Sequence, residues 1–187
     1  MSFERFEKAA DFLDRAVVAG DRGETNMSTD APKATLKTRL LEEFDEEMRS
    51  TRKMLDRIPE DKFSWRPHEK SSSLGKLANH IATAPGKAAI ILKRVETMPP
   101  EAANKAELLA NFDTNVAACR EQLVAMSDDR LAGNMLVTAT MERPVWSVLR
   151  GIGLMNHLIH HRGQLSVYLR LLEVAVPGMY GPSADEK

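Results

Sequence analysis

Four long stretches of this chain carry apolar residues at helical spacing, and they constrain its fold more than any other feature. They cover residues 34–58, 74–95, 105–126 and 144–174. Within each stretch an apolar residue recurs every three or four positions, which is the pattern of a helix that buries one face. The connecting segments contain no convincing pair of strands. The sequence therefore predicts an all-α fold, an up-down four-helix bundle.

Two segments interrupt this pattern. Pro85-Gly86 lies inside the second stretch, and because proline removes a helical hydrogen bond we expect a kink or a break there. Residues 131–143 lack helical periodicity, so we expect a short irregular or extended segment before the last helix. Pro144 suits the first turn of that helix.

The first 33 residues stand apart from the bundle pattern. Apolar residues at helical spacing over residues 3–19 give way to a polar stretch that ends at Pro32. Met27 looks like a second protein start, so we interpret residues 1–26 as an extension; a real additional helix is the alternative. We therefore divide the chain into an N-terminal extension (1–33), the bundle (34–175) and a turn-rich C-terminal tail (176–187).

Composition limits the classes of function. The chain has 26 basic and 27 acidic residues and a formal net charge of −1, so it has no bulk attraction for nucleic acid or anionic lipid. No apolar run reaches the roughly 18 residues that span a bilayer, and the N-terminus lacks the order of a signal peptide. Cys119 is the only cysteine, so no internal disulfide can form, and we expect it to be packed in the core. We expect a cytoplasmic protein without a nucleic-acid or membrane partner.

Three histidines are candidate metal ligands. His157 and His161 are four residues apart, so one helical turn places both rings on one face. Because two imidazoles in an apolar interior are costly unless satisfied, a shared metal ion would explain them. His80, among apolar residues of the second stretch, is the best third ligand. Three imidazoles and one open position form a catalytic zinc set, although imidazole also suits nickel, copper and iron. Histidines that are simply packed in the bundle are the alternative.

The other polar candidates fit the site less well. His160 lies about 100° around the helix from either neighbour, and His68, beside Pro67, reads as a solvated or capping residue. An acidic run in the first stretch reads as a solvated helix face, and the catalytic residues stay unknown. The run consists of Glu42, Glu43, Asp45, Glu46 and Glu47.

Longer strings in these segments resemble the DinB family. The run Met-Asn-His-Leu-Ile-His-His-Arg-Gly-Gln-Leu-Ser-Val-Tyr-Leu-Arg-Leu at 155–171 resembles its last-helix motif. Phe-Ser-Trp-Arg-Pro-His at 63–68, followed by Leu-Ala-Asn-His-Ile at 77–81, is similar to its loop and second helix. Residues 176–186 look like the tail of many members. The resemblance covers roughly residues 35–186.

The resemblance implies a DinB/YfiT-like bundle that holds a divalent metal ion on His80, His157 and His161. We expect this ion to be zinc or nickel. The family contains transferases and isomerases that use low-molecular-weight thiols. We therefore expect a metal-dependent enzyme, a thiol S-transferase or hydrolase-like enzyme, that activates such a thiol or water for a small-molecule substrate. The alternative is a stress-associated metal-binding bundle without turnover. A closed site would favour this alternative, and a pocket at the metal would favour catalysis.

The fourth stretch carries apolar residues on more than one face. Neighbouring helices or the 131–143 segment can bury this surplus, or it can form a homodimer interface. Dimers occur among the proteins that the chain resembles, so we expect a homodimer. The surplus consists of Val145, Val148, Ile152, Met155 and Ile159.

Overall fold

Side-chain caps mark where three of the long helices begin. In the computed structural model, which describes residues 34–92 and 100–186, α2 (Leu36–Asp56) follows Thr35, whose hydroxyl accepts a hydrogen bond from the backbone N–H of Thr38. Ser73 caps α3 (Leu74–Ile91) in the same way, and Asn104 caps α4 (Lys105–Ala125). Each cap satisfies an N–H that has no partner inside its helix. The fourth long helix, α7 (Met155–Leu171), begins without a side-chain cap.

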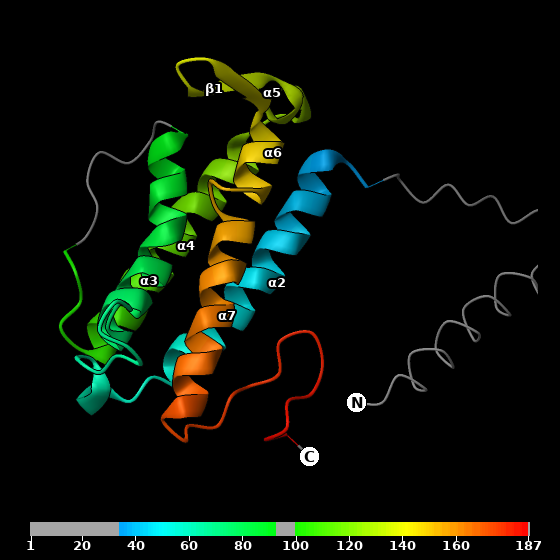
Figure 1. The fold of residues 1–187 in the computed structure, drawn as a ribbon. Coiled ribbons are helices and arrows are strands. Elements are labelled where there is room, and N and C mark those ends of the chain that lie inside the picture. Colours follow the sequence, from blue (N-terminus) through cyan, green and yellow to red (C-terminus); the bar gives the residue numbers. More distant parts are fainter. Residues whose placement is uncertain (1–33, 93–99, 187) are drawn as a thin grey trace, which may run out of the picture. The chain divides into compact units, whose positions relative to one another are not determined.

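These four helices pack as the predicted all-α bundle (Figure 1). Around the bundle their order is α2, α4, α3, α7, so α2 and α3 occupy diagonal corners. The start of α4 lies beside the end of α2, where the Lys105 ammonium donates to the Asp56 carbonyl. Tyr168, near the end of α7, donates to the Ser72 carbonyl just before α3. Helices α3 and α7 are therefore antiparallel neighbours.

The apolar stripes of the four helices form one core. Fully buried side chains come from all four helices and from the segment between α4 and α7; they include Phe44, Leu55, Ile81, Phe112, Leu131, Leu149 and Leu158. Cys119 is buried there, as predicted, and burial raises the pKa of its thiol to about 12.

The fourth predicted helix is interrupted, which corrects the continuous helix expected over residues 144–174. A short helix, α6 (Val145–Arg150), precedes α7, and Gly151 to Leu154 separate them. A Cβ atom on Gly153 would lie 2.7 Å from the Val148 carbonyl oxygen. Because no side chain fits at that distance, the chain turns there on glycine. Helix α7 then ends at Leu171, three residues earlier than predicted.

The segment before α6 contains the expected extended piece. After the short helix α5 (Asp128–Ala132), β1 (Asn134–Thr138) pairs antiparallel with β2 (Met141–Pro144), with Asn134 opposite Pro144. Of the kink or break expected at Pro85-Gly86, the break is absent, because α3 continues through both residues to Ile91; the kink stays a prediction. The predicted extension (1–33) and the predicted end of the second helix (93–95) lie outside the described residues.

Most of the apolar surplus of the fourth stretch is buried within the chain. Val145, Val148 and Met155 are at most 5% exposed, and Ile159 is half-buried. Ile152, in the turn between α6 and α7, is 76% exposed. The homodimer therefore stays a prediction, now without most of the surface that motivated it. None of the described helices combines the length and the apolar character that crossing a membrane requires.

Candidate metal centre

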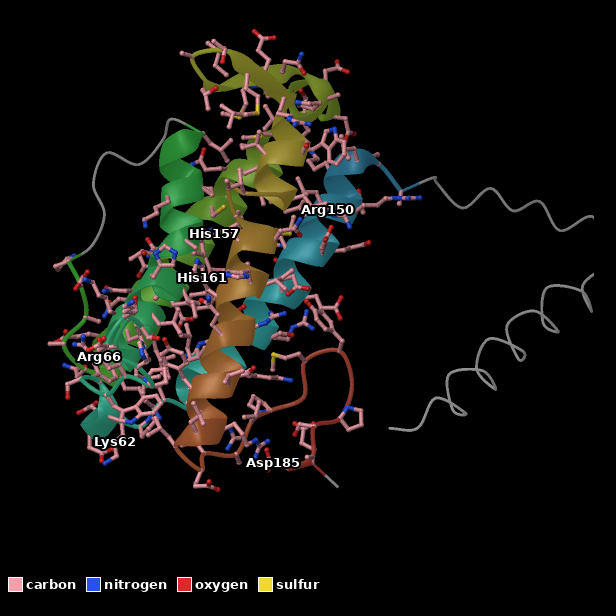
Figure 2. All side chains as sticks on the ribbon, viewed as in Figure 1. Lys62, Arg66, Arg150, His157, His161 and Asp185 are labelled. Carbon is pink, nitrogen blue, oxygen red and sulfur yellow. The ribbon has the colours of Figure 1, made fainter. Side chains whose placement is uncertain are left out.

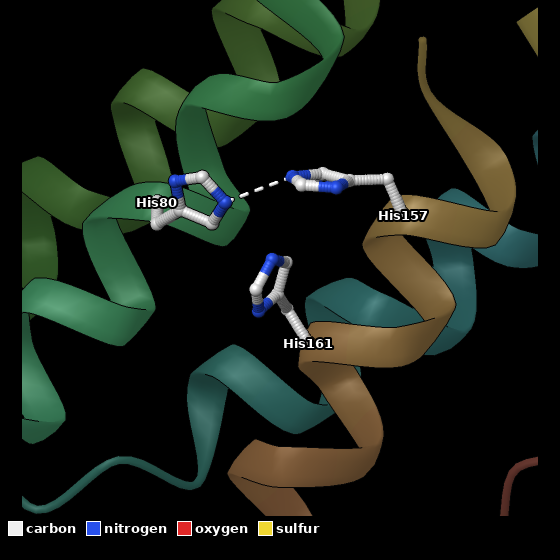
Figure 3. A group of neighbouring side chains, drawn as sticks. All are labelled: His80, His157 and His161. Atoms are coloured by element: carbon white, nitrogen blue, oxygen red, sulfur yellow. Dashed lines mark hydrogen bonds between the residues drawn. The ribbon is translucent and has the colours of Figure 1, made fainter. Parts of the chain in front are cut away.

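The three candidate ligands come together between α3 and α7. His157 and His161 lie one turn apart on α7 and face α3 (Figure 2). His80 lies on α3 and points into the same space (Figure 3). A ligand nitrogen from each ring lies within 4.8 Å of the other two. The helical spacing and the antiparallel packing of the two helices are therefore sufficient to assemble the set.

The rings are close enough to share one small cation. His80 Nε2 lies 2.8 Å from His157 Nε2, so one of these two atoms carries the proton of a hydrogen bond between the rings. The three ring centroids are separated by 4.4 to 5.0 Å. Nitrogen ligands about 2.0–2.1 Å from a tetrahedral ion lie ~3.4 Å apart. This separation lies between the 2.8 Å that joins the His80 and His157 nitrogens and the 4.8 Å within which all three ligand nitrogens lie. The donor set fits a divalent ion such as zinc or nickel.

A hydrogen bond orients the third ring. His161 Nδ1 donates to the side-chain oxygen of Gln164, at 2.8 Å and one turn further along α7. This contact places the proton of His161 on Nδ1 and leaves the lone pair of Nε2 for a cation. Such a partner on the outer nitrogen is the usual way in which proteins fix a histidine ligand.

The environment keeps two of the rings neutral. Burial, followed by the positive potential of His161, Lys87 and His157, lowers the pKa of His80 to about 4. Burial also lowers the pKa of His157, with smaller contributions from His161 and Lys87. A neutral imidazole is the form that binds a metal. At neutral pH these two rings therefore need not lose a proton before they bind a metal ion.

Each of the two helices is anchored by a residue next to a ligand. Asn79 precedes His80, and its side chain donates to the Gly75 carbonyl and exchanges two hydrogen bonds with the backbone of Ala102. This pairing fastens α3 to the segment before α4. Because Asn79 is buried, the contact holds the backbone of His80 firmly. The sequence reading did not find this anchor.

The second anchor is a buried ion pair. Arg162 follows His161, is 3% exposed, and its Nη2 lies 2.7 Å from Glu47 Oε2 on α2. Its Nη1 donates to the Glu47 carbonyl and to the Thr51 hydroxyl, at 3.1 Å each. The Tyr180 hydroxyl accepts from Arg162 and donates to Glu47 Oε1, which attaches the C-terminal tail to the pair.

These contacts correct the reading of the acidic run. Glu42 and Glu46 are exposed, and Glu43 and Asp45 form ion pairs with Arg150 and Arg120, as on a solvated face. Glu47 is the exception, because it is 6% exposed. A signal for the buried pair was present, since Glu47 and Thr51 share the apolar stripe of α2, and Arg162 shares that of α7 with Leu158 and Leu165.

The two histidines set aside stay outside the cluster. His160 is exposed, and its ring centroid lies 5.0 Å from that of His161. His68 is an exposed loop residue whose Nδ1 accepts a hydrogen bond from the Lys70 N–H. This agrees with the solvated residue that was one of the two expectations for His68, and Ser73, not His68, caps the helix that follows.

Two open clefts border the histidine cluster. The larger, about 500 Å³, is lined by His80 and His161, with Gln164, Tyr168, Leu77, Ser71, Ser72, Lys70 and Lys76. The smaller, about 150 Å³, borders His80 from the other side, and its wall includes Asn79 and Thr83. The three ligand candidates are only partly buried. They therefore lie at the edge of the bundle, within reach of a small molecule, and not in a sealed core.

Comparisons with known proteins agree with this architecture. The sequence model of the DinB family matches residues 27–187. The uncharacterized protein YjoA of Bacillus subtilis is 29% identical over 128 residues, which cover 64% of this chain and 80% of YjoA. The crystal structure of a DinB-like protein from Bacillus cereus matches with a TM-score of 0.67 and 27% identity, over 79% of this chain and 99% of that one. The crystal structure of YjoA matches with a TM-score of 0.60 and 20% identity, over 80% and 98%, which is a likeness of fold.

Proposed function

Because the chain belongs to the DinB family and brings three histidines together beside an open cleft, we propose that it is a metal-dependent enzyme. Its ligands are His80, His157 and His161, and its ion is divalent, with zinc or nickel favoured. The proposed reaction is thiol S-transfer or a hydrolase-like reaction, in which a low-molecular-weight thiol or water attacks a small-molecule substrate.

One observation carries the proposal: the larger cleft reaches two of the three ligand candidates, His80 and His161. Structural metal sites are closed by four protein ligands, whereas catalytic sites keep one position open. Here three imidazoles converge and the cleft leads to them. This arrangement favours a site at which a small molecule completes the coordination.

The residues around the site support distinct tasks. Gln164 fixes the tautomer of His161, and the two anchored helices hold the spacing of the three rings. A bound ion would supply a Lewis acid that lowers the pKa of a thiol or a water molecule in the open position. Ser71, Ser72 and Tyr168 line the cleft and offer polar groups that orient a substrate.

The second candidate function is metal binding without turnover. It is favoured by the absence of a carboxylate among the residues that line the larger cleft, because an acid or base usually assists thiol transfer and hydrolysis. In place of a carboxylate, the larger cleft offers the side chains of Lys70, Lys76 and Tyr168 as proton carriers.

Metal analysis of protein purified without an affinity tag, followed by ligand titration, separates these candidates. We expect one divalent ion per chain, and we expect thiols to change the absorption spectrum of the cobalt(II)-substituted protein. Thiol-transfer and ester-hydrolysis assays on the same sample then identify the reaction. Stoichiometric metal with a spectrum that no thiol and no pH change perturbs would favour the binding protein. Protein that retains no ion would reject both.

A further inference from the structure

Lysines lie on both sides of His80 along α3. Lys76, His80, Thr83 and Lys87 are spaced by four, three and four residues, which places them in one stripe on the helix. Lys76 lines both clefts that border the histidine cluster, and Lys87 lines the smaller one. Lys70, in the loop before α3, completes the wall of the larger cleft. All three lysines are exposed.

The charge around the site is therefore one-sided in a chain that is nearly neutral overall. The larger cleft is lined by Lys70 and Lys76 and by no acidic residue. In the smaller cleft, Glu101 is the one acidic residue beside Lys76 and Lys87. Among the described residues, none of these lysines forms an ion pair, whereas Lys62 and Lys105 do. The positive potential also reaches the ligands, since Lys87 contributes to the lowered pKa values of His80 and His157.

The neutral groups of the larger cleft also suit an anion. The Ser71 and Ser72 hydroxyls stand beside the two lysines, and hydroxyl and ammonium groups donate hydrogen bonds to carboxylate oxygens. Tyr168, whose hydroxyl donates to the Ser72 carbonyl, also lines the cleft, and Trp65 packs edge-on against its ring at a centroid distance of 5.7 Å. The cleft thus brings lysine and serine donors together with the metal ligands His80 and His161, and Lys76 lies one turn before His80 on α3.

We propose that the small molecule taken up by this site is a thiol that also carries a carboxylate. The thiol reaches the histidine cluster, and the carboxylate lies between Lys70 and Lys76. Lys76 is then the main specificity residue, because it faces both clefts. This inference rests on the proposed function and adds the class of thiol to it.

Because the lysines are exposed, the expected effect of removing one on thiol affinity is small. An exposed ammonium–carboxylate contact contributes about 0.2–1 kcal/mol, so removal of one lysine should weaken the binding of an anionic thiol by about 1.4- to fivefold. The effect should shrink as salt rises, because the Debye length falls from about 30 Å at 0.01 M to about 3 Å at 1 M. A neutral thiol should respond to neither change.

The test measures thiol affinity on the cobalt(II)-loaded full chain by absorption. Mercaptosuccinate and 3-mercaptopropionate provide anionic thiols, 2-mercaptoethanol a neutral one and cysteamine a cationic one. We expect affinity to fall in that order at low salt, and we expect Lys76→Gln to reduce the preference for mercaptosuccinate over 2-mercaptoethanol by about 1.4- to fivefold. Lys53→Gln, an exposed lysine of α2 outside both clefts, is the matched control and should leave the preference unchanged.

The outcomes separate this inference from the function on which it rests. If all four thiols bind with equal affinity, or if Lys76→Gln keeps the full preference, the anionic substrate is rejected while thiol binding stands. If cobalt binds and no thiol perturbs its spectrum, the proposed thiol chemistry fails and the inference fails with it. Competition provides a further arm: succinate should displace mercaptosuccinate better than inorganic phosphate does. The reverse order would overturn the choice of a carboxylate.

Discussion

Replacement of Arg162 by methionine should destabilise the bundle far more than the loss of a surface charge. The guanidinium is 3% exposed and Glu47, its partner, is 6% exposed. Arg162→Met leaves the Glu47 carboxylate buried without its counter-ion and removes the hydrogen bonds to Thr51 and Tyr180. Breaking one side of a buried pair costs about 3–5 kcal/mol. At about 2–4 °C per kcal/mol for a chain of this size, the melting temperature should fall by roughly 6–20 °C.

Urea denaturation of metal-free protein, followed by circular dichroism, measures this cost without interference from the metal site. The control is Arg52→Met, which breaks a pair with Asp113 whose side chains are 45% and 48% exposed and should cost at most about 1 kcal/mol. In the double variant Glu47→Leu/Arg162→Met no charge is left buried, so most of the loss should be recovered. Equal losses in Arg162→Met and Arg52→Met would refute the reasoning, because burial would then have made no difference.

Three further predictions concern the metal site and the limits of the bundle. His157→Ala and His161→Ala should each abolish tight metal binding in metal analysis after gel filtration, whereas His160→Ala should keep it; metal loss in the His160 variant would move the ligand set by one residue. Burial lowers the pKa of His80 to about 4, so between about pH 4 and 6.5 the unfolded chain binds more protons than the folded one, and the stability of metal-free protein should rise with pH across this window. His80→Gln should show a smaller change in urea midpoint between about pH 5 and 7 than the unaltered protein, and an equal change would contradict this assignment. Removal of residues 1–26 should leave cooperative melting and metal content intact, because the core pattern and the family match begin at residue 27 or later; a lost transition would place that segment in the core.

Local periodicity was sufficient to predict most of the fold. The predicted helices 34–58 and 105–126 differ from α2 and α4 by no more than two residues at either end. The fourth helix was predicted as continuous because apolar residues continue through its interruption. Gly151 and Gly153 are the sequence signal for this interruption. Their effect depends on the approach of the Val148 carbonyl, which is a contact of the folded chain.

The site was predictable where it depends on helical spacing and unpredictable where it depends on packing. His157 and His161 follow from one turn of α7, and His80 from the apolar face of α3. The sequence analysis did not predict the anchors Asn79 and Arg162, because their partners, Ala102 and Glu47, are remote in sequence. The sequence analysis also overlooked Lys76 and Lys87, although their spacing of four and seven residues from His80 places them on its side of α3.

The separation of the ligands along the chain gives the site a mechanical consequence. His80 and His157 are 77 residues apart in sequence, although their Nε2 atoms lie 2.8 Å apart. An ion shared by these two side chains would tie the ends of that stretch together, as a removable cross-link does. If the chain were pulled from its ends, the segment between His80 and His157 would bear no force until the ion dissociated. At about 3.3–3.6 Å per extended residue, its release would lengthen the molecule by about 250–280 Å.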